Sequence, residues 1–216
     1  MDAAFWRDRW TQNQIAFHQK DFNPYLVKHG HLLPREGAIL VPLCGKSRDL
    51  LFLAQRGTQV LGCELVETAL EAFYQESGLV YRKTEDVPFV RLEGENIRTY
   101  AGDFFAFSSE RAGPVAAIFD RAAMVALPES MRQAYLEHLF SFLAPGGVCL
   151  MVGLHYQHET PSGPPFSIPA REVIERTSAF ADFTVLQEAD VLMGRPDLQQ
   201  RGYRSYREWV ALLTKR

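Results

Sequence analysis

The stretch from Ala38 to Asp49 constrains the fold of this chain more than any other part of its sequence. A short apolar run with β-branched members, at positions 39–43, is typical of a strand buried on both faces of a parallel sheet. A glycine turn follows at Gly45, and Ser47 then stands as the cap of a helix that Gly57 ends. This order predicts a ligand-binding loop, because free backbone N–H groups at the start of a helix can face a ligand.

Two familiar phosphate-binding motifs do not fit this loop. The tripeptide Gly45-Lys46-Ser47 resembles the end of a P-loop, but that motif needs a glycine five residues before Gly45, where Leu40 stands. The dinucleotide fingerprint G-x-G-x-x-G is also absent, because the turn holds a single glycine. We therefore interpret Lys46 as a solvated turn residue.

The second buried-strand pattern, 60–65, carries an acidic residue near its carboxyl end. Glu64 follows Gly45 by 19 residues, close to the spacing at which an acidic residue receives ribose hydroxyls. Its carboxylate can accept two hydrogen bonds from a 2′,3′-diol, and the alternative is a carboxylate exposed beyond a strand end. A ribose acceptor without a pyrophosphate site favours S-adenosylmethionine over a dinucleotide.

Strand and helix patterns alternate along the rest of the chain, which predicts one doubly wound α/β sheet in a single domain over residues 1–216. The polar stretch from Ser77 to Asn96 predicts an irregular connection with room for a short hairpin. The last two strands are expected to form an antiparallel pair at the sheet edge. The expected strands after the second are 97–105, 115–119, 148–154, 183–193 and 206–214, and the expected helices are 66–77, 171–179 and one opened by Pro128 and closed by residues 145–147.

In such a sheet the ligand lies across the carboxyl ends of the strands. Leu43, Glu64, Asp103 and Arg121 stand at four of these ends, so we expect them to converge. Asp103 is equally compatible with a residue that only forms a turn. The alternative for Asp120 and Arg121 is an ion pair on the surface.

The N-terminal segment 5–17 holds aromatic residues at helical spacing and predicts an amphipathic helix followed by a loop. Trp10 and Phe17 are compatible with ordinary core contacts or with a lid that closes over a flat ligand. We expect residues 1–30 to form a helical lid over the cofactor site. Within it, Asn23 is expected to cap a short helix.

Composition limits the partners of the chain. Of its 216 residues, 47% are hydrophobic and 23% are charged, which is an ordinary globular composition. The net charge is −3, so the molecule as a whole is not attracted to nucleic acid or to an acidic membrane. The three cysteines Cys44, Cys63 and Cys149 lie in or beside apolar runs and are expected to be reduced. No signal segment is recognised, and the apolar stretch 147–154 is too short to span a bilayer. We expect a soluble, cytoplasmic protein.

Five segments carry a family resemblance, in the same order over nearly the whole chain. They are Trp6…Trp10…Phe17-His18, Val41-Pro42-Leu43-Cys44-Gly45-Lys46-Ser47, Gly62-Cys63-Glu64-Leu65, Asp120-Arg121-Ala122-Ala123 and Gly163-Pro164-Pro165-Phe166-Ser167. Together they resemble the thiopurine S-methyltransferase family. The resemblance implies a class I, Rossmann-like S-adenosylmethionine-dependent methyltransferase fold, with a mostly parallel seven-stranded sheet and one antiparallel edge strand. Cys63 departs from the aliphatic residue of many relatives, which we expect to be neutral.

The resemblance also implies roles for individual residues. Phe17 takes the position of the purine contact, and Gly45 belongs to the cofactor loop. The implied contacts to S-adenosylmethionine, or to the product S-adenosylhomocysteine, are Trp10, Leu43, Glu64, Asp103, Phe104 and Arg121.

Methyl transfer from a sulfonium is an in-line displacement, so alignment and exclusion of water are the main tasks of the protein. An aromatic thiol is substantially ionised near neutral pH and needs no strong base. Arg121 and His18 are the candidate catalytic residues, the first holding a thiolate and the second accepting a proton. A structural role for His18 is the alternative. Pro165 and Phe166 suit an apolar substrate wall, or form a plain surface loop.

Other site classes are weaker. His155 and His158 lack a third ligand of suitable type nearby, so no metal site is expected. The N-P-P-Y tetrapeptide of nucleobase amino-methyltransferases is missing after the fourth strand, which argues against nucleic acid as a substrate.

Three functions remain for comparison. The first is an S-methyltransferase for thiopurines and related aromatic or heterocyclic thiols, acting on small molecules as a monomer with a role in detoxification. The second methylates selenium or tellurium oxyanions, thiocyanate or halide. The third is a non-catalytic S-adenosylmethionine-binding module, which would not need Phe17, His18, Pro165 or Phe166.

Overall fold

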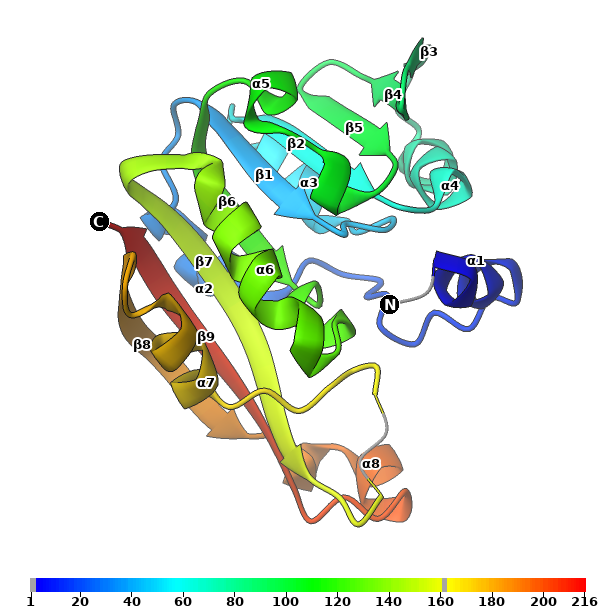
Figure 1. The fold of residues 1–216 in the computed structure, drawn as a ribbon. Coiled ribbons are helices and arrows are strands. Elements are labelled where there is room, and N and C mark those ends of the chain that lie inside the picture. Colours follow the sequence, from blue (N-terminus) through cyan, green and yellow to red (C-terminus); the bar gives the residue numbers. More distant parts are fainter. Residues whose placement is uncertain (1–2, 161–162) are drawn as a thin grey trace. The chain divides into compact units, whose positions relative to one another are not determined.

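The computed structural model describes residues 3–160 and 163–216. The chain forms two compact units, one ending at Phe119 and the other running from Asp120 to Arg216. Figure 1 shows the helices and strands of each unit. Residues 1–2 of the expected N-terminal lid lie outside the described residues.

The first unit holds five α-helices and five complete strands in its described part, and β6 crosses from it into the second. Its elements are α1 (Ala3–Thr11), α2 (Pro24–His29), η1 (Gly30–Leu32), β1 (Ala38–Pro42), α3 (Asp49–Ala54), β2 (Gln59–Glu64), α4 (Glu67–Ser77), β3 (Arg82–Asp86), β4 (Phe89–Glu93), β5 (Ile97–Ala101), η2 (Phe104–Ala106), α5 (Ser109–Ala112) and the start of β6 (Val115–Arg121). Those of the second unit are η3 (Met124–Ala126), α6 (Glu129–Ser141), β7 (Leu143–Gln157), α7 (Ala170–Thr177), β8 (Ala181–Asp190), η4 (Leu192–Gly194), α8 (Pro196–Gln200) and β9 (Ser205–Lys215).

The sheet of the first unit has the strand order β3-β4-β5-β2-β1-β6, and β1 lies between two parallel neighbours. Ile39 of β1 is opposite Val60 of β2 on one side and Ala117 of β6 on the other. Ile39 and Leu40 are fully buried, as expected for a strand covered on both faces. The predicted α/β class, with a mostly parallel central sheet, is therefore confirmed.

The stretch between α4 and β5 is more regular than expected. The expected irregular connection with room for a short hairpin is a fully paired antiparallel hairpin of β3 and β4, and β4 continues the sheet by pairing with β5. The sequence Arg82–Asp86 of β3 is almost entirely charged because this strand lies at the edge, where neither face is well covered. Phe89 and Leu92 anchor β4 in the core.

The sheet of the second unit has the order β7-β9-β8, and β9 is antiparallel to both neighbours. The antiparallel pair of final strands is confirmed. The antiparallel strand itself is β9, which lies between β7 and β8 rather than at the edge. The described residues form nine strands instead of seven, because the β3–β4 hairpin is added to the expected set.

The end of α6 was also predicted wrongly. Residues 145–147 do not close this helix: it ends at Ser141, and β7 begins at Leu143. The ammonium of Lys215 stabilises this end, because it donates to the carbonyl of Phe140 in the last turn of the helix (2.9 Å) and to that of Leu143 at the start of β7 (2.6 Å). A carbonyl left free at the end of the helix is thus satisfied by a residue distant in sequence.

Helix α3 starts one residue later than predicted, with Arg48 and not Ser47 at the cap position, and it ends before Gly57. The Oγ of Ser47 accepts the N–H of Asp49 (3.1 Å) and donates to its carboxylate (3.0 Å), so Ser47 contacts the helix without being its cap residue. Asp49 is buried and also accepts the N–H of Asn23 at 2.7 Å. This bond ties the start of α3 to α2, whose predicted cap by Asn23 is confirmed.

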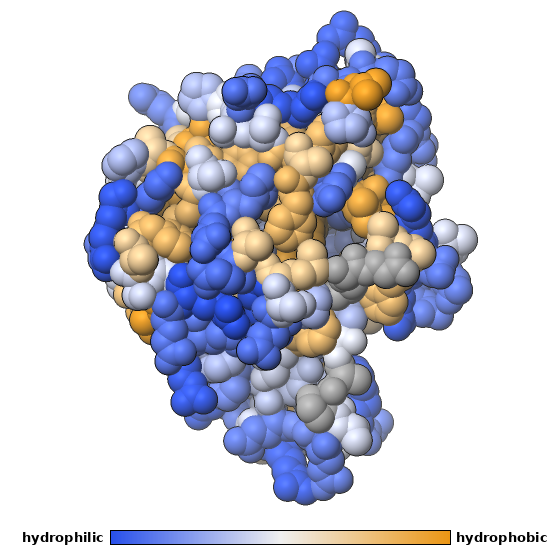
Figure 2. Space-filling view, in the orientation of Figure 1, coloured by the Kyte–Doolittle hydropathy of each residue, from blue (hydrophilic) through white to orange (hydrophobic). Residues whose placement is uncertain are grey.

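No helix in the described part of the chain is long and apolar enough to cross a membrane. The face shown in Figure 2 is largely hydrophilic, with hydrophobic residues visible in patches between the hydrophilic ones. Such patches are ordinary for a globular surface.

Candidate active site

The carboxylate of Glu64 is the centre of the candidate site. It is only 7% exposed at the end of β2, and its two oxygens accept different backbone N–H groups. Oε2 accepts from Gly45 at 2.8 Å, and Oε1 accepts from Val66 at 3.0 Å. Burial raises the pKa of Glu64, and the bonds from Val66 and Gly45 oppose that rise by stabilising the charged form. Each oxygen can accept a further hydrogen bond, which is what two adjacent hydroxyls require.

The turn after β1 has an unusual backbone. Leu43 has a φ of +46° and Gly45 a φ of +53°, so both lie in the left-handed region. This conformation is natural for glycine, but it is strained for leucine and is found most often at functional sites. The strain at Leu43, half-buried directly after β1, is a feature that no local sequence pattern announces, since the residue is not a glycine.

The aromatic residues of the N-terminal segment contact this turn. A Cβ atom at Gly45 would lie 2.9 Å from Cζ2 of Trp10, so the indole lies directly against the glycine. The ring of Phe17 meets Trp10 edge-to-face, with centroids 5.7 Å apart. The backbone N–H of His18 donates to the carbonyl of Ile15 at 2.8 Å, which fixes the loop after α1. None of the described residues of α1 is fully buried, and its aromatic side chains are half-buried.

The end of β5 joins the same edge of the sheet. The N–H of Gly102 donates to the backbone carbonyl of Glu64 at 2.8 Å, which brings Asp103 next to the end of β2. The exposed side chain of Asp103 accepts the N–H of Phe105 at 3.0 Å, so it does form a turn. Phe104 is buried, with 4% of its surface exposed. The structure therefore brings the predicted residues of β1, β2, β5 and the N-terminal segment together.

Two candidate residues at the end of β6 have opposite environments. Asp120 is 1% exposed, and its carboxylate accepts the hydroxyl of Tyr135 at 2.7 Å and the N–H of Met124 at 3.4 Å. Burial raises the pKa of Asp120 to about 6, although the Tyr135 bond works against this rise. Arg121 is half-buried, and alternation along the strand directs it to the opposite face. A surface ion pair is therefore the wrong description of Asp120. Ala122, the next residue, has a φ of +62°.

The loop that carries Pro165 and Phe166 is tied to the body of the second unit. The carbonyl of Pro165 accepts the hydroxyl of Tyr156 at 2.9 Å, and the N–H of Phe166 donates to the carbonyl of Val125 at 2.7 Å. Pro165 is exposed and Phe166 half-buried. The loop is consequently held in place and not a loose surface segment.

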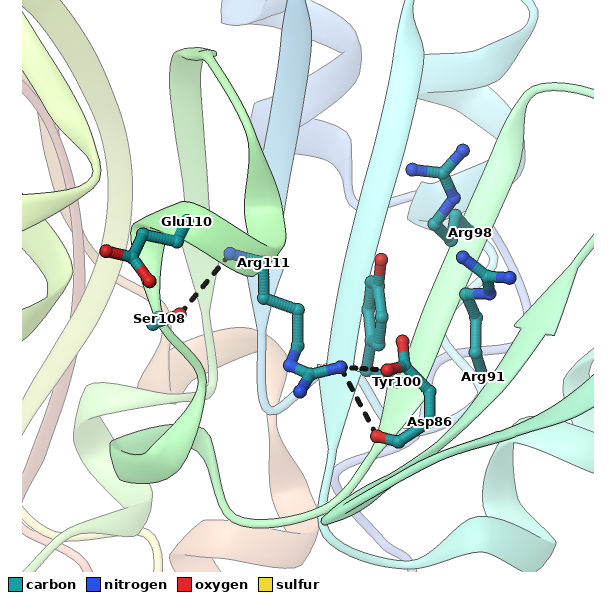
Figure 3. A pocket seen from close by; sticks show the side chains of 7 residues that line it. All are labelled: Asp86, Arg91, Arg98, Tyr100, Ser108, Glu110 and Arg111. Carbon is teal, nitrogen blue, oxygen red and sulfur yellow. Dashed lines mark hydrogen bonds and ion pairs between the residues drawn. The ribbon is translucent and has the colours of Figure 1, made fainter.

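A hollow of about 420 Å³ lies elsewhere in the first unit, over β4, β5 and α5 (Figure 3). Each of its arginines lies near a carboxylate: Arg111 pairs with Asp86, and Arg98 donates to Glu93 at 2.7 Å and 2.9 Å. Nε of Arg91 lies 3.8 Å from Glu93, without a hydrogen bond. Because these charges are compensated within the hollow and beside it, the arginines act as ties between the hairpin and its neighbours.

Metal-ligating residues do not gather in the described parts of either unit, where no group of three His, Cys, Asp or Glu side chains could hold an ion. One ring nitrogen of His158 faces the carbonyl of Arg201 at 2.8 Å and the other that of Thr160 at 2.9 Å.

The comparison with known families agrees with this geometry. A family model described as thiopurine S-methyltransferase (TPMT) matches residues 1–216. The chain belongs to the thiopurine S-methyltransferase family. A thiopurine S-methyltransferase of Shewanella baltica (strain OS185) is 42% identical over 198 residues, which are 91% of each chain. Another, of Shewanella oneidensis, is 39% identical over 218 residues and covers 100% of both chains.

Solved structures share the fold of this family member at low sequence identity. A SAM-dependent methyltransferase from Anabaena variabilis superposes with a TM-score of 0.64 at 16% identity, covering 99% of this chain and 95% of the other. The 1,6-didemethyltoxoflavin-N1-methyltransferase of Burkholderia thailandensis, solved with S-adenosylhomocysteine, gives 0.63 at 17% identity, covering 98% and 87%. The chain thus has the α/β methyltransferase fold.

As a member of the thiopurine S-methyltransferase family, the chain is an enzyme that uses S-adenosylmethionine to methylate sulfur. The expected class of enzyme and the expected cofactor are confirmed. Sequence analysis missed the bond from Val66 to Glu64 and the strained φ at Leu43 and Ala122. It also missed a buried arginine beside Phe166.

Proposed function

We propose that this enzyme methylates the thiol of thiopurines and related aromatic or heterocyclic compounds, and that Glu64 receives the ribose of S-adenosylmethionine. The cluster of Trp10, Gly45 and Glu64 supports this assignment most strongly. Residues that lie far apart in sequence meet there around one buried carboxylate that accepts backbone N–H groups. That is the donor and acceptor chemistry a ribose diol requires.

The cofactor supplies a methyl group on a sulfonium, which the acceptor sulfur displaces in line as S-adenosylhomocysteine leaves. In our proposal Glu64 accepts the ribose hydroxyls, while the turn at Leu43 and Gly45 allows close approach of the backbone. Trp10 covers the turn, excludes water and presents an aromatic face that attracts a sulfonium. Asp103 and Phe104, beside the end of β2, are assigned to the adenine side of the cofactor.

The acceptor is assigned to the remaining candidates. Phe17, edge-on to Trp10, suits a planar heterocycle, and Pro165 with Phe166 supplies an apolar wall. We propose that Arg121 holds the ionised sulfur or a ring nitrogen as a permanent cation. His18 is proposed to take up a proton from acceptors that arrive as neutral thiols. Alignment of the two sulfur centres then provides most of the acceleration.

Calorimetry of Glu64→Ala with S-adenosylhomocysteine tests the cofactor half of the proposal. Loss of a charge-assisted bond of roughly 1.5–3 kcal/mol weakens binding about tenfold or more. Glu76→Ala is the matched control, because its carboxylate bonds Lys46 of the same loop at 2.6 Å but is 56% exposed. An unchanged dissociation constant for Glu64→Ala, in a protein that still melts cooperatively, would refute the ribose role.

A methyl-transfer assay with radiolabelled cofactor tests the acceptor half. We expect turnover of 6-mercaptopurine and thiophenol to exceed that of selenite and tellurite, and Arg121→Ala to lower kcat at saturating cofactor. Preference for the oxyanions would favour the alternative acceptor class. Tight cofactor binding without transfer to any of them would favour a binding module, and full activity of Arg121→Ala would remove that residue from catalysis.

We further propose that the enzyme works in the cytoplasm as a monomer that detoxifies small thiols. Cys44, Cys63 and Cys149 are buried and unbridged, which supports a reducing compartment. Exposed large hydrophobic residues come from separate segments, as in α2, α7 and β8, which supports a monomer. Sedimentation at micromolar concentration checks this, since a dimer mass would contradict it.

A further inference from the structure

Arg132 of α6 is a buried cation outside the set of candidate site residues. Its side chain is only 6% exposed, although it carries a permanent charge. The Nε–H donates to the carbonyl of Leu127 at 3.1 Å, and the terminal nitrogen Nη1 donates to both carboxylate oxygens of Glu172 at 3.0 Å. These bonds fix the plane of the guanidinium. A buried charge is retained only where partners compensate it, and here α7 supplies them.

This fixed guanidinium lies over the ring of Phe166. Cζ of Arg132 lies 5.6 Å from the centroid of the ring, within the range of a cation–π contact. On another side the ring packs so closely on Gly163 that a Cβ atom there would overlap it. The backbone N–H of Phe166 is held by Val125 at 2.7 Å. The position of the ring is therefore defined by a glycine, a backbone bond and a cation.

We propose that Arg132 is a positioning residue for methyl transfer: it sets the orientation of the Phe166 ring against which an aromatic acceptor packs. This inference rests on the proposed function, in which Phe166 forms part of the acceptor wall. Arg132 acts through Phe166 and Glu172 holds Arg132, so α6 and α7 together determine the shape of the wall. A ring displaced by about 1 Å would misalign the acceptor sulfur.

Lysine cannot replace arginine in this arrangement. A lysine ammonium is a point charge on a flexible chain, without a planar face or the Nε–H that Leu127 accepts. Arg132→Lys keeps an ion pair with Glu172, and so keeps most of the stability, but it releases the ring. Arg132→Gln removes the charge as well.

The test measures KM for 6-mercaptopurine and for S-adenosylmethionine separately in Arg132→Lys and Arg132→Gln. We expect KM for the thiol to rise about three- to tenfold in both, with KM for the cofactor within twofold of wild type. Arg176→Gln is the matched control: Arg176 donates to the same Glu172 oxygen at 2.9 Å, but its polar contacts in the described part of the chain are with Glu172, Glu129 and Gln133 and not with Phe166. Its KM for the thiol should stay near wild type.

Phe166→Ala separates the two levels of the inference. If it raises KM for the thiol and Arg132→Lys adds no more than twofold to that rise, the two residues act as one unit, as proposed. If the rises in KM for the thiol in Phe166→Ala and Arg132→Lys multiply in the double variant, or if Arg132→Lys alone has the wild-type KM, the positioning role of Arg132 is overturned. The assignment of Phe166 to the acceptor wall is then unaffected. An unchanged thiol KM in Phe166→Ala would overturn the wall itself, and the role of Arg132 with it.

Discussion

Replacing Gly45 with alanine probes the contact between the turn after β1 and Trp10 of α1. Gly45 has a φ of +53°, and a Cβ atom there would lie 2.9 Å from Cζ2 of Trp10. The substitution therefore combines a backbone strain with a collision. Gly57→Ala is its matched control, because Gly57 has a φ of +84° and a Cβ atom added there would meet no described atom within 4 Å.

The two effects have different magnitudes and different readouts. A left-handed conformation costs a residue with a Cβ about 1–2 kcal/mol, and the smaller unfolded-state entropy of alanine offsets about 0.4–1 kcal/mol of this. Both variants should lose about 1 kcal/mol of unfolding free energy, or about 2–4 °C in Tm for a chain of this length. In Gly45→Ala, Trp10 must also retreat by about 0.6 Å to restore an ordinary carbon–carbon contact. Because α1 buries none of its described residues, this retreat costs little stability.

The assay pairs urea denaturation with calorimetric titration of S-adenosylmethionine. We expect similar loss of stability in both variants, and a roughly three- to tenfold weaker affinity in Gly45→Ala alone, because Trp10 no longer covers the sulfonium. Wild-type affinity in Gly45→Ala would refute a role for Trp10 at the cofactor. Equal loss of affinity in Gly57→Ala would show that strain, and not the collision, is responsible.

Two further substitutions test buried polar groups. The pKa of Asp120 is about 6 in the folded protein against 3.8 for the free group, so its neutral form is favoured by folding. Relative to Asp120→Asn, the wild-type free energy of unfolding should fall by up to about 3 kcal/mol as the pH rises from below 4 to above 6. Urea denaturation at each pH measures this difference. If the free energies of unfolding of the two proteins change with pH in the same way, the prediction is wrong. In α2, the Oδ1 of Asn23 accepts the N–H groups of Tyr25 (3.0 Å) and Leu26 (3.3 Å), so Asn23→Ala should cost about 1–2 kcal/mol by the same method. Thr11→Ala is the control there, because its hydroxyl bonds only one exposed carbonyl, and an equal loss would argue against the cap.

The central part of the fold was predictable because buried strands and helix faces produce recognisable patterns of apolar residues in the sequence. The strands β1 and β2 are continuous apolar runs, and α4 shows an apolar face and a Gly78 in the left-handed conformation at its end. The pattern of apolar residues did not define the hairpin of β3 and β4, for which the sequence indicated only an irregular connection with room for a short hairpin. An edge strand made of charged residues has no buried face to give it a period, so its pairing depends on the neighbouring strand.

The site was predictable only where spacing carries information. The separation of 19 positions from Gly45 to Glu64 covers the helix and the second strand of one strand–helix–strand unit, so the two were expected at the same edge, and they are hydrogen-bonded. The approach of Trp10 to Gly45 joins segments with no shared periodicity, and only the folded chain reveals it. Arg132 was missed for a related reason. An arginine in a helix is normally solvated, and its burial follows from Glu172 on a different helix.

The position of β9 has a consequence for how the protein must be made. This strand is synthesised after β7 and β8, yet it lies between them and supplies the buried residues Trp209, Val210 and Leu213. Until it emerges from the ribosome, β7 and β8 lack the strand that lies between them in the finished protein. The second unit is therefore expected to close only after residues 205–215 have left the ribosome, and a ribosome stalled before residue 205 should hold a protease-sensitive nascent chain.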